Sequence, residues 1–477
     1  MTILPIHPAE NASPEALVAF LRQCREAARS DGQARLVSIS LKVGALDPLA
    51  VLEAIFEAGE LHFYAERPNI QTAIAGAEAV LTHEAEGPER FASVRRFIDD
   101  TLARTIAVGD VDAPFGGPHF FTAFGFLDNV EPGEAFPAAR VFVPRWQVAR
   151  AGDVTTAVAN LLVAPDADLA SLAERVWRAH GKFHHFDYGT QAAGGGSSAN
   201  DTAKPGVFHT TEVGDFRAAV AGGLAAIAGG AVKKIVLARA QDMRADAPLH
   251  PLTLLNGLRE RFPECYSFSV ANGRGHSFIG ASPERLVRVS KGVLETEALA
   301  GSARRGTGAS EDAALGAALI ASEKDQREHR HVLDSIVRRL EPLGLAPQFS
   351  AKPGLRKLAN VQHLHTPVTA TMPEGVHLLD ALARLHPTPA VGGSPREEAV
   401  ARIRDLEGFP RGLYAGAIGW LNARGGGEFM VGIRSALVEG ATARVYAGAG
   451  IVAGSDAERE FAETELKFRA MREALLA

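Results

Sequence analysis

The sequence contains only two cysteines, Cys24 and Cys265, among 477 residues. Two thiols this far apart are too few for a disulfide framework or a zinc site, and their scarcity fits a reducing cytoplasm. Long apolar runs are also absent. A transmembrane helix requires about 18 or more residues without charges or glycine clusters, and the sequence has no such stretch. Residues 1–15 lack the basic start and apolar run of a signal peptide. We therefore expect a soluble cytoplasmic protein without a membrane partner.

Neither sign of charge dominates the sequence. Its 56 acidic and 50 basic residues give a formal net charge of -6. A mildly acidic chain has no global attraction to nucleic acid, so an anionic substrate needs a local basic site or a metal. Hydrophobic residues make up 46% and charged residues 22%, as in an ordinary globular enzyme.

The residue patterns predict mixed α and β structure without a regular βαβ rhythm, which argues against a doubly wound parallel sheet. The Gly- and Ser-rich segment 189–205 is either a domain linker or a long loop within one domain. Helices are predicted at 13–28 (Ser13 as cap, Pro14 first), 88–104, 212–227, 311–340 and 456–476. Strands are predicted at 35–42, 60–64, 77–82, 118–127 and 234–239, with a hairpin of 266–271 and 277–281 around a turn at 272–275.

A lysine and a glutamate could carry acid–base chemistry. Lys233 and Lys234 begin a predicted strand, where successive side chains face opposite sides, so one of the two must point toward apolar neighbours. That lysine is either a strand-end cation reaching solvent or a desolvated amine that acts as a base. Glu284 follows a strand at a turn, and it is either exposed or a partly buried carboxyl with a raised pKa that donates a proton.

Other residues could hold an anion or a cation. Gly301 and Ser302 offer backbone amides close to Arg304 and Arg305, as in an anion-binding loop. Two helical stretches, 322–329 and 456–467, are strongly charged. Such runs are usually solvated faces, but carboxylates on separate helices can also hold Mg²⁺, which prefers oxygen ligands.

Taken in order, these segments resemble the chorismate-utilising enzymes across residues 232–472. The matching motifs are KIVLAR, FIGASPERL, EALAGSARRG, SEKDQREH, QHLHTP, HPTPAVGG, GIRSA, YAGAGIV and EREFAETELK. The resemblance implies a single large two-lobed α/β (α+β) fold with mostly antiparallel sheets in a sandwich-like core and helices outside. It implies a less distinctive N-terminal lobe at 1–200 and the catalytic region at 205–477, so that 189–205 is a loop.

The resemblance also implies a role for each matched residue. Lys234 matches the general base and Glu284 the general acid. Glu328 and Glu463 match Mg²⁺ ligands, and Glu460 lies beside that metal in similar proteins, where it can bind through water. The residues that match substrate-binding positions are Gly301, Ser302, His363, Arg434, Gly448, Gly450 and Lys467.

Two positions indicate the branch of the family. Ala300 stands where aminodeoxychorismate synthases place a nucleophilic lysine, and 387–393 (PTPAVGG) differs from the PAGT of anthranilate synthases. The resemblance thus implies an isomerase, an isochorismate synthase that adds water to chorismate, with Mg²⁺, without a glutamine amidotransferase and as a monomer. The alternative is a salicylate synthase, which forms isochorismate and then expels pyruvate. Tyr414 and Val391 are the positions that we expect to discriminate between these two enzymes. A less favoured alternative is an enzyme like component I of anthranilate synthase.

Overall fold

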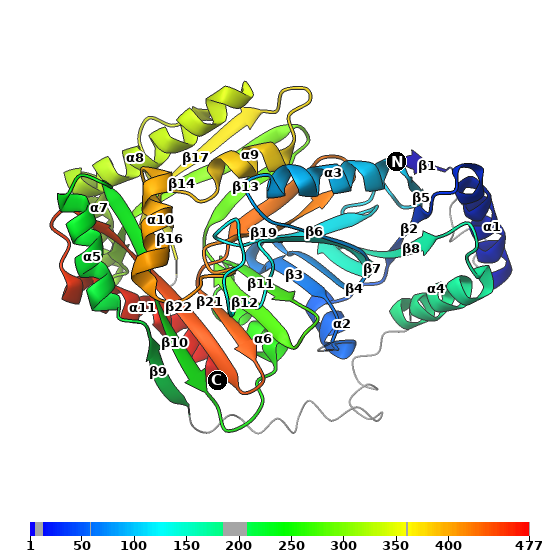
Figure 1. Cartoon of the computed structure of the whole chain (residues 1–477), viewed down its shortest axis with the longest axis horizontal. Coiled ribbons are helices and arrows are strands. Elements are labelled where there is room, and N and C mark those ends of the chain that lie inside the picture. The colour runs from blue at the N-terminus through cyan, green and yellow to red at the C-terminus, as the bar shows by residue number, and fades with distance from the viewer. Residues whose placement is uncertain (5–12, 58, 185–207, 359–360, 477) are drawn as a thin grey trace.

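The computed structural model describes residues 1–4, 13–57, 59–184, 208–358 and 361–476 (Figure 1). The helices are α1 (Pro14–Asp31), α2 (Pro48–Ala54), α3 (Arg90–Ala103), α4 (Leu169–His184), α5 (Phe216–Ala228), α6 (Pro251–Arg261), α7 (Ala309–Ala321), α8 (Glu323–Leu340), α9 (Leu378–Leu385), α10 (Arg396–Glu407) and α11 (Ala457–Leu475), with short 3₁₀ helices at Pro68–Ile70 and Glu341–Leu343. The strands are β1 (Thr2–Ile3), β2 (Arg35–Val43), β3 (His62–Arg67), β4 (Thr72–Ala85), β5 (Thr105–Gly109), β6 (His119–Phe124), β7 (Ala139–Ala151), β8 (Val154–Val163), β9 (His209–Val213), β10 (Lys234–Arg244), β11 (Tyr266–Ala271), β12 (His276–Ser282), β13 (Arg285–Ser290), β14 (Val293–Arg304), β15 (Gln348–Phe349), β16 (Gly354–Lys357), β17 (Val361–Thr371), β18 (Gly393–Ser394), β19 (Ala417–Asn422), β20 (Gly427–Val431), β21 (Ser435–Glu439) and β22 (Thr442–Val452).

Strand β7 is the branch point of a connected, largely antiparallel sheet. From β7, one arm runs through β4, β3, β11, β12, β21 and β22 to β10. The other arm runs through β6, β19, β20, β13 and β14 to β17. One apolar core contains side chains of both arms, among them Ile235 of the first and Leu286 and Phe429 of the second. The shared core holds the two arms together.

Two strand pairings join distant parts of the chain. β3 pairs with β11, with Ala65 opposite Phe268, and β6 pairs with β19, with Thr122 opposite Gly419. Each early strand therefore completes the hydrogen-bond ladder of a strand that lies roughly two hundred residues or more later in the sequence.

Helices cover the outside of both arms. α8 packs on β14 and β17, α11 packs on β22, and α5 and α10 pack on β10. Figure 1 shows α1 and α4 together at the end of the molecule opposite α5 and α7. This arrangement confirms the predicted α+β class with antiparallel sheets inside and helices outside. No helix in the described part of the chain is long and apolar enough to cross a membrane.

Local signals predicted several elements correctly. Helix α1 begins at Pro14, and the Ser13 hydroxyl accepts a hydrogen bond from the Ala16 amide at 3.1 Å, as expected for an N-cap. The hairpin of β11 and β12 also forms around the predicted turn. Helices α3 and α11 and strand β2 lie where they were expected. The segment 189–205 lies outside the described residues, and the boundary between 1–200 and 205–477 stays a prediction.

Other boundaries were wrong. The helix predicted at 311–340 is two helices, α7 and α8, because Ser322 leaves the helical conformation and its hydroxyl caps α8 through the Asp325 amide at 3.3 Å. Residues 212 and 213, predicted as helix, belong to β9, because they pair with Gln241 and Ala240. The same pairing extends β10 to Arg244 instead of residue 239.

Candidate active site

Lys234 is the lysine that enters the protein interior. It begins β10, whose next residues are buried on both faces, and only 8% of Lys234 is exposed, whereas Lys233 is exposed. The Lys234 ammonium donates a hydrogen bond to Glu328 Oε1 of α8 at 2.8 Å. The structure therefore confirms that one of the two lysines lies in a desolvated environment, and it places an acidic partner beside that lysine.

Two glycines of β22 leave room beside Lys234. Gly450 and Gly448 face β10, in register with Val236 and Ala238. A Cβ atom at Gly450 would lie 3.0 Å from Lys234 Cε, and one at Gly448 would lie 2.8 Å from the Tyr414 hydroxyl. Any larger residue at these positions would displace the lysine or the tyrosine. The glycines thus make room for the side chains of Lys234 and Tyr414, and their substrate-binding role stays a prediction.

A buried ion pair takes the place of a strand beside β10. β18 pairs with the start of β10 and β9 with its end, but no strand in the described part of the chain pairs with residues 236–239 on that side. Arg411 donates to the Val236 carbonyl at 2.7 Å, and the Glu407 carboxylate accepts from the Ala238 amide at 2.6 Å. Arg411 also donates to the Val391 carbonyl at 2.9 Å. This pair fixes the strand that carries Lys234 and was not predicted from the sequence.

Glu284 lies in the short connection between β12 and β13 and is 9% exposed. Burial, and then the nearby carboxylate of Glu297, raise its pKa to about 7, although the positive charges of Lys234 and Arg356 oppose that rise. Glu284 is thus buried and not exposed, its pKa is shifted in the direction that a proton donor needs, and its role as the acid stays a prediction. Lys234 and Glu284 also lie close enough to influence each other electrostatically, so an amine and a carboxyl with a raised pKa share one site.

Four basic or polar residues gather next to that pair. His363 Nδ1 lies 2.8 Å from the Ser302 hydroxyl, and Lys467 donates to the Gly448 carbonyl at 2.6 Å. Burial, followed by the positive charges of Arg434 and Lys467, lowers the pKa of His363 to about 4. Two cations beside a neutral imidazole and a hydroxyl form a suitable environment for carboxylate groups.

Gly301 shapes the strand next to His363. It has a φ of +76° and lies at a bulge in the pairing of β14 with β17. A Cβ atom there would approach Asp325 Cβ to 3.1 Å, so glycine suits both the backbone angle and the space. The neighbouring Arg304 and Arg305 do not provide free positive charge, because they pair with Glu311 and Asp312 of α7.

The predicted metal-binding carboxylates lie on two helices. Glu328 of α8 pairs with Lys234, and Glu463 of α11 pairs with Lys467 at 2.7 Å. Partial burial and the like charge of Glu463 raise the pKa of Glu460, although Ser455, Lys467 and Lys324 oppose the rise. In the ranges that the structure describes, no group of three or more His, Cys, Asp or Glu residues is placed to hold a metal. A cation here would need substrate or water as further ligands.

Glu297 was not predicted as a site residue. The residue as a whole is 8% exposed, and its carboxylate accepts hydrogen bonds from Arg356 Nη1 at 2.7 Å and from His365 Nε2 at 2.8 Å. Burial opposes ionisation, but these partners outweigh it and lower the pKa of Glu297 to about 2. The only sequence signal was its position within the EALAGSARRG motif, which does not identify its partners.

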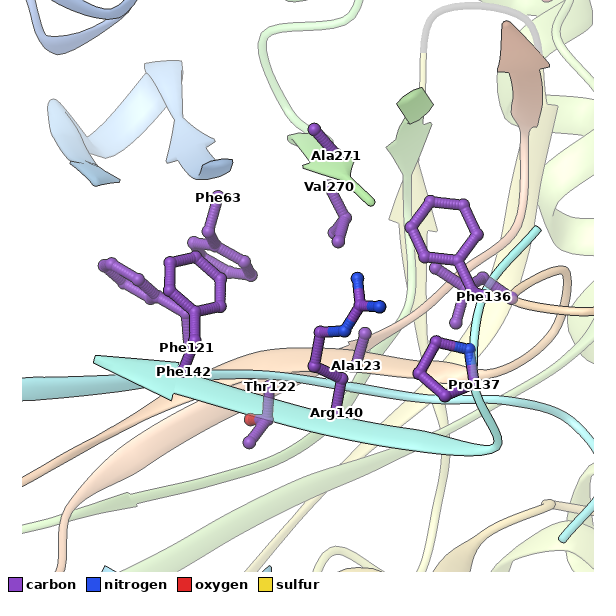
Figure 2. Close-up of a pocket in the computed structure, with 11 residues that line it drawn as sticks. Phe63, Phe121, Thr122, Ala123, Phe136, Pro137, Arg140, Phe142, Val270 and Ala271 are labelled. Carbon is purple, nitrogen blue, oxygen red and sulfur yellow. The ribbon is translucent and has the colours of Figure 1, made fainter. Parts of the chain in front are cut away.

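An apolar pocket lies apart from these residues (Figure 2). Phe63, Phe121 and Phe142 lie together on one side of it, and Phe136 lies on the other. The rings of Phe63 and Phe121 stack at a centroid separation of 4.5 Å. None of the described residues that line it is a predicted site residue. We therefore regard it as a packing feature where β3, β6, β7 and β11 meet.

Comparisons with known proteins match this architecture over nearly the whole chain. The family model described as chorismate binding enzyme matches residues 19–476. A salicylate biosynthesis isochorismate synthase of Pseudomonas aeruginosa is 35% identical over 471 residues, 96% of each chain. An isochorismate synthase of Bacillus subtilis is 31% identical and covers 94% of this chain and 95% of its own.

Solved structures agree with the sequence matches. The menaquinone-specific isochorismate synthase of Escherichia coli superimposes with a TM-score of 0.76 at 25% identity, and the match covers 96% of this chain and all of that one. A putative 2,3-dihydroxybenzoate-specific isochorismate synthase of Bacillus anthracis gives 0.68 at 26% identity and covers 90% of this chain and 99% of its own. With a family model that spans almost the entire sequence, this chain belongs to the chorismate-binding enzyme family.

Proposed function

We propose that this protein is an isochorismate synthase that converts chorismate reversibly to isochorismate. The family membership and the names of the similar proteins support this reaction. The structural observation that carries the proposal is the shared site of Lys234, a buried amine, and Glu284, a carboxyl whose pKa burial and Glu297 raise to about 7. Addition of one water and loss of another requires both a base and an acid.

In the proposed reaction, Lys234 in its neutral form accepts a proton from a water molecule whose oxygen bonds to C2 of the ring. The ring double bonds shift, and the bond from C4 to its hydroxyl breaks. Glu284 donates its proton to that hydroxyl, which leaves as water. One water enters and one departs, so substrate and product are isomers. A carboxyl that holds its proton to about pH 7 suits this donor role.

The remaining site residues would bind and orient the substrate. Arg434 and Lys467 would hold its carboxylates, while His363 would lie near the ring and the departing hydroxyl. The amides of Gly301 and Ser302 and the backbone of Gly448 and Gly450 would complete the contacts.

The acidic residues fit a magnesium ion. Glu328 and Glu463 would be its ligands, and Glu460 would contribute through water, since Mg²⁺ commonly uses one or two carboxylates together with water and substrate oxygens. Glu460 and Glu463 lie close enough on α11 for the charge of one to raise the pKa of the other, and a bound cation would relieve that repulsion. When bound, Mg²⁺ would neutralise and orient the ring carboxylate of chorismate.

Product analysis tests the proposal. Purified protein is incubated with chorismate and Mg²⁺ without ammonia, and the products are separated by chromatography. We expect isochorismate in reversible balance with chorismate, and no pyruvate. Salicylate with pyruvate would assign the protein to the salicylate synthases, and anthranilate formed only with added ammonia would overturn the choice of water as nucleophile. We also propose that the protein is a monomer. Light scattering on the same sample measures its molar mass and tests this proposal.

A further inference from the structure

One face of the β14–β17–β16 sheet carries a second polar cluster behind Glu284. Residues two apart on a strand share a face, and Glu297 of β14 lies on the face that carries His365 of β17. His365 is opposite Leu299, which is two residues from Glu297, and Arg356 of β16 is opposite His363. The cluster of Glu297, Arg356 and His365 is therefore continuous with the proposed substrate-binding face but is assigned no role in the reaction described above.

Glu297 is held by donors from three other strands. Its Oε1 accepts from Arg356 Nη1 at 2.7 Å and from the Arg285 amide at 3.2 Å, and its Oε2 accepts from His365 Nε2 at 2.8 Å. Both oxygens are thus occupied, and the side chain is only 4% exposed. A carboxylate with this many donors stays ionised and cannot swing away. The bond to the Arg285 amide fixes it against the residue that follows Glu284.

The charged groups around Glu284 come from three strands. Lys234 of β10, Glu297 of β14 and Arg356 of β16 lie close enough to Glu284 to act on it electrostatically. Of these groups only Glu297 favours the protonated form of Glu284, since the two cations favour the ionised form. Because Arg356 is paired with Glu297, loss of the Glu297 charge would also leave Arg356 free to act on Glu284. Both effects would lower the pKa of Glu284.

We propose that Glu297 is a positioning residue. It is a fixed anion that favours the protonated form of Glu284, which Glu284 needs in order to act as the general acid. Arg356 and His365 hold Glu297 in its ionised form. This proposal depends on the acid role proposed for Glu284. It predicts opposite effects for two charge-removing variants. Glu297→Gln favours ionisation of Glu284, whereas Arg356→Gln favours its protonation while His365 and the Arg285 amide still bind Glu297.

The test compares kcat and KM for chorismate across a pH series in the full-length protein. For Glu297→Gln we expect the step in the pH profile of kcat that reports Glu284 to move to lower pH. At pH values above the step, kcat should be about tenfold lower than in the unmodified protein for each pH unit by which the step moves. At pH values well below the step, kcat should match the unmodified protein, because Glu284 is then protonated in both. KM should change little. Arg356→Gln should move the step upward.

Two further variants separate charge from structure. Glu297→Asp keeps the charge and should keep the step near its original pH. Glu311→Gln removes a carboxylate that pairs with the exposed Arg304 at the far end of the same strand, β14, and should leave the profile unchanged. A uniform loss of kcat at all pH values in both Glu297→Gln and Arg356→Gln would overturn the proposal and indicate a purely structural cluster.

A measurement without turnover distinguishes this inference from the proposed function. Infrared spectroscopy across a pH series follows the absorption band of the protonated Glu284 carboxyl. The band is assigned to Glu284 because it is missing from the Glu284→Gln variant. The band should titrate at lower pH in Glu297→Gln and at higher pH in Arg356→Gln. If it does so but chorismate is not consumed, the coupling holds and the proposed function fails. If isochorismate forms but the band does not move in either variant, the coupling is overturned and the function stands.

Discussion

Lys234 and Glu328 form an ion pair across two structural layers, with 2.8 Å between the ammonium nitrogen on β10 and the carboxylate oxygen on α8. The lysine side chain is 9% exposed and the glutamate 36%. The proposed base is thus paired with a proposed metal ligand. Coulomb attraction from Lys234 lowers the pKa of Glu328 against the opposing effect of its partial burial. The two proposed roles are therefore coupled through one contact.

Replacing Lys234 tests the role of the base separately from its charge. Lys234→Arg keeps a cation for Glu328, but a guanidinium does not deprotonate and cannot accept a proton from water. We expect kcat for chorismate to fall at least about a hundredfold in both Lys234→Arg and Lys234→Met. Circular dichroism should show an unchanged fold. Near-normal turnover in Lys234→Arg would mean that the position needs only positive charge.

Removal of divalent cations should abolish activity, and Mg²⁺ should restore it. Glu463→Gln should raise the Mg²⁺ concentration that gives half-maximal activity by at least about tenfold, because a charged oxygen ligand becomes a neutral one. Glu473→Gln is a matched control on the same helix, where Glu473 pairs with Arg469 at 2.6 Å on the surface. Equal Mg²⁺ requirements in the two variants would exclude Glu463 as a ligand.

Gly450→Ala should reduce activity without unfolding the protein. The added methyl group would lie 3.0 Å from Lys234 Cε, so the lysine must shift. A small displacement of a reacting group can lower kcat by about tenfold to a hundredfold. Gly257→Ala in α6 is the control, because a Cβ atom there meets nothing within 4 Å. Comparable kcat values in both variants would contradict a close approach of Gly450 to the base.

Arg411→Met should destabilise the protein strongly. The change leaves the Glu407 carboxylate buried without its cation and removes the donors to the Val236 and Val391 carbonyls. Breaking a buried pair in this way costs about 3–5 kcal/mol in the free energy of unfolding, which urea denaturation measures. Arg469→Met, which breaks an exposed pair with Glu473, should cost less than about 1 kcal/mol. Similar losses would mean that the Arg411 pair is not structurally important.

Elements with strong local signals could be predicted from the sequence. The prediction failed where pairing with a distant strand determines the secondary structure. Ser13 and Pro14 start α1 by their own chemistry. By contrast, residues 212 and 213 look helical locally and become strand because β10 offers them a partner. Ser322 had the properties of a cap, but good helix formers lie on both sides of it, alanine and leucine before and glutamate and lysine after, and they obscured the helix break.

The same distinction applies to the site. Alternation could not choose between Lys233 and Lys234, because β10 is buried on both faces; the resemblance to a family chose Lys234. Neither approach found the environment of Glu297. Its donors at Arg285, Arg356 and His365 belong to three different strands, and only the register of the sheet brings them together.

The pairing of β3 with β11 and of β6 with β19 has a consequence for biosynthesis. β3 and β6 can pair early with β4 and β7, but a ribosome releases them long before β11 and β19 exist, so one edge of each strand stays open during much of translation. Such edges can pair with those of neighbouring chains and cause aggregation. Expression of residues 1–184 alone should therefore give insoluble material, and co-expression with the remainder should be needed to recover soluble protein.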